Sequence, residues 1–126
     1  MVRRTKRVSF EEAVSYLEPG ADELSFKDAI EEFIADRKLR NLAPQTIKYY
    51  QEGMKYLLIY LKRLDIEREK PFQVQSNDIK KIITYLMEKG NAITGINTYI
   101  RAWRTFFNFL EQENYLVENP FEKVKS

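Results

Sequence analysis

Apolar residues recur at helical spacing along this chain, and the stretch 94–114 shows the pattern most clearly. Six of its apolar side chains fall within an arc of roughly 120° on a helix. They are Ile96, Ile100, Trp103, Phe106, Phe107 and Leu110. We therefore predict a helix over 94–114 that begins at Thr94 as its N-cap and buries this stripe in a core.

The same stretch carries a second stripe, which is polar. Its four side chains lie within about 60° of one another and well away from the apolar arc. They are Asn97, Arg101, Arg104 and Asn108. One face of this helix is therefore suited to a core, and the other face is suited to a polar or anionic partner.

Three earlier segments show the same helical spacing. One helix is predicted from Ser25, its cap, to near Asn41, a second over 44–64, and a third over 78–89 with Ser76 or Asn77 as its cap. On the second helix the predicted core positions are Ile47, Tyr50, Met54, Leu57, Leu58 and Leu61. On the third helix they are Ile79, Ile82, Ile83 and Leu86. We found no strand-type alternation, so the predicted fold is all-α.

The remaining segments connect or flank these helices. Residues 1–24 read as a basic tail, a short helix over 10–17 and a linker. Residues 65–75 form a charged connector, and the chain is expected to trail away after Asn119-Pro120. The prediction is a four-helix bundle over 25–126 with a short N-terminal helical leader.

The composition argues against catalysis. The 126 residues contain no histidine and no cysteine, which removes the usual general base, the commonest metal ligand and any disulfide. Neighbouring acids such as Glu31 and Glu32 point apart on a helix. We expect no catalytic residue, metal or cofactor in this chain. With no secretory signal and no membrane-spanning run, we expect no membrane partner and a cytoplasmic location.

Positive charge is distributed unevenly, although the net charge is only +2. Lys48, Lys55 and Lys62 recur every seven residues along one side of the second helix and span about 21 Å. They either follow a phosphate backbone or form an ordinary solvated face. Residues 1–7 add four basic residues without an acid, as a DNA-contacting arm or a solubilising tail.

Residues 42–61 read LAPQTIKYYQEGMKYLLIYL: a threonine, three residues, a tyrosine and then a leucine-rich helix. This order resembles the opening of the core-binding domain of tyrosine recombinases of the phage-integrase type. Thr46 and Tyr50 occupy the family's threonine and tyrosine places.

Two later features resemble the same domain. Residues 96–110 (INTYIRAWRTFFNFL) resemble its last helix, and Asn119-Pro120 stands where the family has an Asn-Pro exit. The matching positions in the last helix are Asn97, Arg104, Phe106 and Phe107. The three features occur in the family's order, and the resemblance covers residues 25–126.

The resemblance implies a SAM-like bundle that forms one half of a clamp around duplex DNA. In the family, a C-terminal catalytic domain forms the other half and supplies the nucleophilic tyrosine and the residues that activate it. None of those catalytic positions has a counterpart in this chain, so we expect it not to cut or join DNA alone. The implied partners are double-stranded DNA, the missing catalytic domain and other recombinase protomers.

Eight residues are the DNA-binding candidates. They are Thr46, Lys48, Lys55, Lys62, Asn97, Arg101, Arg104 and Asn108. The arginines and asparagines suit phosphates or base edges, and Thr46 suits a phosphate at a helix start. Two of these residues also have an intramolecular interpretation. Arg104 could stack on Trp103 or pair with Glu111, and Thr46 could make a local helix-start contact.

A second function class remains open. Tyr49, Tyr56 and Tyr60 lie off the predicted core stripe of the second helix. Exposed aromatic residues are typical of protein–protein contacts, so the chain could instead be a helical adaptor that does not bind nucleic acid.

Overall fold

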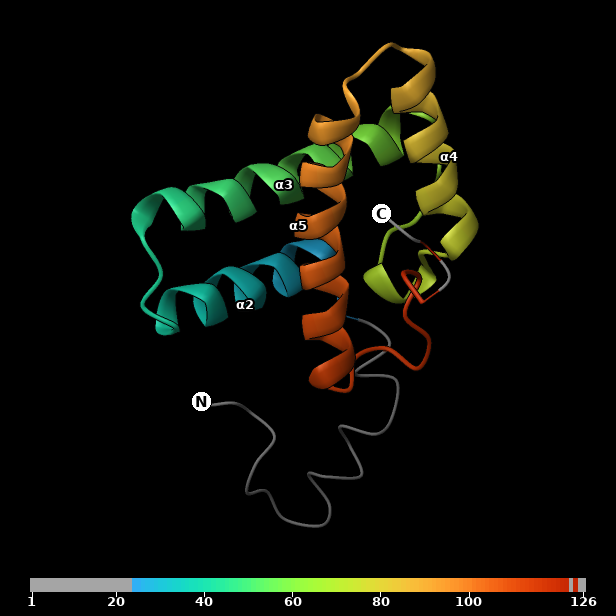
Figure 1. Ribbon diagram of the computed structural model, residues 1–126. Helices are drawn as coiled ribbons and strands as arrows, with labels where there is room; N and C mark the ends of the chain where they lie inside the picture. Colours follow the sequence, from blue (N-terminus) through green and yellow to red (C-terminus); the bar gives the residue numbers. More distant parts are fainter. Residues whose placement is uncertain (1–23, 123, 125–126) are drawn as a thin grey trace.

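A computed structural model of the chain describes residues 24–122 and 124. These residues form four α-helices and one 3-10 turn, and no strand occurs among them. The elements are α2 (Phe26–Leu39), α3 (Pro44–Arg63), η3 (Pro71–Gln73), α4 (Ser76–Glu88) and α5 (Ile93–Gln112). The all-α, four-helix prediction is confirmed (Figure 1). The predicted short helix over 10–17 lies outside the described residues.

The helix starts were predicted with mixed success. Ser25 caps α2 as expected, and its hydroxyl accepts a hydrogen bond of 3.0 Å from the amide of Asp28. The predicted caps of the two later helices are wrong, because α4 is capped by Gln75 and α5 by Ala92. The carboxylate of Asp78, in the first turn of α4, accepts a hydrogen bond of 2.9 Å from the backbone amide of Gln75. A side chain within the helix therefore caps its start.

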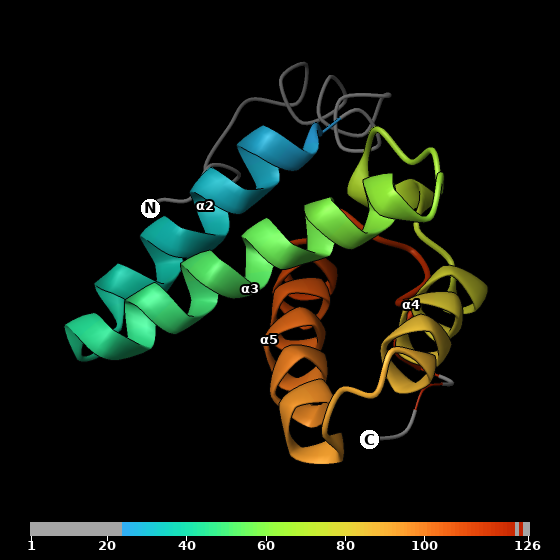
Figure 2. The same cartoon turned by 90° about the horizontal axis from the view of Figure 1, so that it is seen from above.

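Helices α2 and α3 run side by side as an antiparallel pair, and α5 crosses them steeply with α4 on its other side (Figures 1 and 2). The predicted apolar stripe of α5 is entirely buried, as are Met54 and Leu57 of α3. Phe33 of α2 stands edge-on to Tyr50 of α3 and to Phe106 of α5. One aromatic core therefore joins the three helices.

Two predictions on α3 are wrong. Leu58 is 38% exposed instead of buried, and Tyr60 is only 5% exposed instead of facing solvent. The reason is that α3 packs against α5 as well as α2. The ring of Tyr60 stands edge-on to Tyr99 and Trp103 of α5, which shifts the buried face of α3 away from Leu58.

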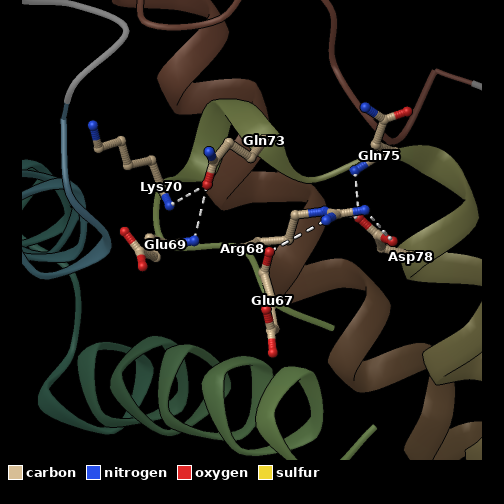
Figure 3. A network of polar contacts seen from close by, with 7 residues as sticks. All are labelled: Glu67, Arg68, Glu69, Lys70, Gln73, Gln75 and Asp78. Carbon is tan, nitrogen blue, oxygen red and sulfur yellow. Dashed lines mark hydrogen bonds and ion pairs between the residues drawn. The ribbon is translucent and has the colours of Figure 1, made fainter. Parts of the chain in front are cut away.

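The connector between α3 and α4 is ordered by its polar residues (Figure 3). The side-chain oxygen of Gln73 accepts hydrogen bonds from the amides of Glu69 and Lys70 at 2.9 and 3.1 Å. Arg68 donates to both carboxylate oxygens of Asp78, at 2.8 and 3.3 Å. Because Asp78 also caps α4, one buried carboxylate ties the connector to that helix.

The C-terminal segment does not trail away as predicted. Its apolar side chains pack on the bundle, and they include Tyr115, Leu116, Phe121 and Val124. The buried Asn119 donates to Asn108 and Glu111 of α5 at 2.8 and 2.9 Å. The hydroxyl of Ser76 donates to the carbonyl of Pro120 at 2.7 Å. The segment is therefore held against both α5 and α4.

The crossing of α3 and α5 depends on a glycine. A Cβ added to Gly53 would lie 2.8 Å from the Cβ of Ala102, closer than real Cβ contacts. The indole nitrogen of Trp103 also donates to the Gly53 carbonyl at 2.8 Å. The two backbones approach this closely because neither residue has a side chain beyond one methyl group.

We expect Gly53→Ala to lower the free energy of unfolding by about 1–3 kcal/mol, because neither Cβ can move without shifting a helix. Gly95 is the matched control. It also lies in a helix, but a Cβ there would meet nothing within 4 Å. Gly95→Ala should therefore stabilise the protein by up to about 1 kcal/mol through helix propensity. Urea denaturation of both variants tests this, and equal effects would contradict it.

Candidate nucleic-acid interface

The three lysines of α3 are exposed, as the sequence predicted. Lys48, Lys55 and Lys62 form no ion pair with any of the described residues 24–122 and 124. The Lys55 ammonium lies 5.7 Å from the ring centre of Tyr56, a cation–π distance. The lysine face is therefore charged and accessible to an anionic partner.

The polar stripe of α5 divides into two parts with different surroundings. Arg101 is exposed, and its guanidinium lies 3.5 Å from the hydroxyl of Thr98. Tyr49 of α3 donates to the carbonyl of Thr98 at 2.9 Å. Burial raises the pKa of Tyr49 although the charge of Arg101 opposes the shift, so the hydroxyl keeps the proton that it donates. Asn97, on the same part of α5, is half-buried.

Arg104 and Asn108 are engaged within the molecule. Arg104 donates to the carbonyl of Val124 at 3.0 Å, and its guanidinium lies 5.3 Å from the ring centre of Phe121. Asn108 accepts the hydrogen bond from Asn119. The intramolecular partners of Arg104 are thus in the C-terminal segment, whereas the sequence suggested Trp103 or Glu111.

A shallow hollow of about 400 Å³ lies between α3 and α5. Its lining residues are Tyr49, Tyr50, Arg101, Arg104, Thr105 and Asn108. Two arginines and no acid line it, so it is suited to an anion. Three of the eight sequence candidates meet here.

Thr46 lies apart from this hollow, in the first turn of α3. It is half-buried, and its amide donates to the carbonyl of Ala43 at 2.9 Å. Within the described part of the chain its hydroxyl makes no hydrogen bond. The structure therefore brings Arg101, Arg104 and Asn108 together, and leaves Thr46 and the lysines along α3.

Tyr49 is a residue of this surface whose contact the sequence did not indicate. Its place seven residues before Tyr56 was the available signal, because residues seven apart share a helix face. Both tyrosines contact α5, and both are half-buried. With Tyr60 buried as well, these tyrosines form a contact inside the protein instead of the exposed surface that an adaptor would need.

Two further observations concern other kinds of site. Over residues 24–122 and 124, no three side chains of the metal-binding types come together. In the same part of the chain, no helix combines the length and the apolar character needed to cross a bilayer.

Comparison with known proteins gives a consistent result. The sequence model of the family described as the phage integrase SAM-like domain matches residues 25–126. Tyrosine recombinase XerC of Oceanobacillus iheyensis is 28% identical over 85 residues, which cover 68% of this chain and 27% of that protein. Tyrosine recombinase XerD of Listeria monocytogenes serotype 4b is 24% identical over 102 residues, 79% of this chain and 33% of that protein.

The chain spans about a third or less of the length of these curated relatives. No solved structure matches it.

Proposed function

This chain belongs to the phage integrase SAM-like domain family, and from that premise we propose that residues 25–126 are the core-binding domain of a tyrosine recombinase. In this proposal the domain grips duplex DNA through α3 and α5 and performs no chemistry itself. A catalytic domain and other recombinase protomers complete the active assembly.

The observation that carries the proposal is the corner between α3 and α5. Lys48 of α3 directly precedes Tyr49, whose hydroxyl bonds to Thr98 of α5, and the Arg101 guanidinium lies beside Thr98. Lys48 and Arg101 are both exposed, and neither forms an ion pair within the described residues. Each of the two helices therefore carries an exposed cation without an acidic partner close to the point where Tyr49 joins them.

Phosphate contacts supply most of the affinity in this mechanism. Lysine neutralises phosphates and releases counterions, which makes binding weaken steeply as salt rises. We assign Arg101 to a backbone phosphate, like Lys48, and Asn97, on the same part of α5, to base edges in the major groove. Arg104 and Asn108 contribute less directly, because they also hold the C-terminal segment.

Fluorescence anisotropy of a labelled duplex, titrated at several salt concentrations, tests the proposal. Lys48→Ala with Arg101→Ala should weaken binding by about tenfold or more and make the slope of log K against log salt shallower by about 2. Lys27→Ala, an exposed lysine on α2, is the control and should leave the slope almost unchanged. A wild-type protein whose weak binding ignores salt would contradict the proposal.

The adaptor function is not favoured, because the tyrosines that suggested it pack against α5. Light scattering during size-exclusion chromatography provides an independent check. A stable dimer that fails to bind DNA would favour the adaptor.

A further inference from the structure

Four tyrosines meet on the side of α5 that faces α4. They are Tyr56 and Tyr60 of α3, Tyr85 of α4 and Tyr99 of α5. The ring centres of neighbouring members lie 5.6–6.2 Å apart. Tyr99 in turn stacks on the buried Trp103 at 5.3 Å. The cluster is therefore anchored in the core and has a fixed geometry.

Two cations lie against the rings of this cluster. The guanidinium of Arg63 lies 5.8 Å from the ring centre of Tyr60, and the ammonium of Lys89 lies 5.4 Å from that of Tyr85. Both cations are exposed, and neither pairs with an acid within residues 24–122 and 124. We call Arg63, Tyr85 and Lys89 the α4-side patch.

The hydroxyl of Tyr85 belongs to this positive region. Hydrogen bonding by Arg63, together with the charges of Lys89 and Arg63, lowers the pKa of Tyr85. A hydroxyl in such a field offers a hydrogen-bond donor between two charged donors. This combination of one guanidinium, one ammonium and one hydroxyl suits the oxygens of a phosphate group.

The α4-side patch and Arg101 lie on different sides of α5. Successive residues of a helix point about 100° apart. Arg101 lies two residues after Tyr99, so their side chains point about 200° apart: Arg101 lies beside Tyr49, whereas Tyr99 contacts Tyr56 and Tyr60. Arg101 and the α4-side patch therefore lie on different sides of α5, whose N-terminal end is close to the end of α4 in both views (Figures 1 and 2).

A helix that enters the major groove of DNA has a phosphate backbone on each side of it. We propose that the α4-side patch binds the backbone of one DNA strand while Lys48 and Arg101 bind the backbone of the other. The N-terminal half of α5 then lies in the groove between the two strands. This inference rests on the proposed DNA-binding function and adds a second phosphate site to it.

Both cations lie at helix ends, where positive charge also stabilises the helix. The test therefore needs a measurement that a loss of stability alone would not change. Arg63→Gln with Lys89→Gln keeps most of each side chain and removes both charges. Lys80→Gln with Lys81→Gln removes the same charge from exposed positions nearer the start of α4 and is the matched control.

We expect the Arg63→Gln/Lys89→Gln variant to make the slope of log K against log salt shallower by about 2 in the anisotropy titration. The control pair should change it by much less. An unchanged slope for the Arg63→Gln/Lys89→Gln variant would overturn the α4-side patch while leaving the proposed function intact. Absence of DNA binding by the wild-type protein would instead overturn the proposed function, and the patch with it.

Ethylation interference on the bound duplex gives a second measurement that is independent of affinity. The Arg63→Gln/Lys89→Gln variant should lose interference at phosphates of one strand, and the Lys48→Ala/Arg101→Ala variant at phosphates of the opposite strand. Loss at the same phosphates in both variants would contradict the two-strand arrangement.

Discussion

Replacing Trp103 by alanine is expected to lower the free energy of unfolding by about 3–5 kcal/mol, because a large buried side chain would leave a cavity at the helix crossing. Trp103 is fully buried, stacks on Tyr99 with an interplanar angle of 8° and stands edge-on to Tyr60. Its indole also donates to Gly53. Urea denaturation followed by far-UV circular dichroism measures the change, since the variant lacks the only tryptophan of the chain.

Trp103→Phe separates packing from hydrogen bonding. It keeps an aromatic ring but removes the donor to Gly53, and we expect it to cost less than the alanine variant. If Trp103→Ala cost no more than about 1 kcal/mol, the typical value for one hydrogen bond, the indole would not be the main support of the crossing.

Replacing Asp78 by alanine is expected to lower the free energy of unfolding by about 2–4 kcal/mol. Its carboxylate is 3% exposed and accepts hydrogen bonds from Arg68 and from the Gln75 amide. Removing it leaves a guanidinium and an amide without their acceptor at the start of α4. We place the effect below the full penalty for a buried ion pair, because the Arg68 side chain is 33% exposed and water can partly solvate it.

A double-mutant cycle with Arg68→Ala isolates the ion pair. We expect Arg68→Ala alone to cost less than Asp78→Ala, since the aspartate would keep its bond to Gln75. The two single variants could instead lose the same free energy of unfolding, with no further loss in the double variant. In that case the hydrogen bond from Gln75 would contribute nothing, and Asp78 would stabilise the protein only through Arg68.

Much of the fold followed from the spacing of apolar residues. All six predicted members of the stripe of α5 are buried, because they face one continuous core, although Ala102 and Phe109 are buried as well and were not predicted. The face of α3 was predicted less well, because Tyr60 is buried by contacts with Tyr99 and Trp103, which lie about forty residues later in the sequence. Local periodicity contains no information about such a partner.

The surroundings of the candidate residues were predicted in the same uneven way. The exposure of Lys48 and Arg101 followed from their distance from the apolar stripes. The partners of Arg104 and Asn108 did not, because they belong to a C-terminal segment whose docking on α5 is not visible in local patterning. Arg63 and Lys89 were overlooked because their shared surface arises only when the ends of α3 and α4 meet around the tyrosines.

The glycine at the crossing has a consequence for how such a domain could diversify. Because Gly53 and Ala102 leave no room for a larger side chain where α3 and α5 cross, this point limits the angles that the two helices can adopt. A larger residue that the fold tolerated at position 53 would rotate one set of cations relative to the other without altering any of them. Preference among DNA duplexes of different groove width could therefore change through a residue that never touches the nucleic acid.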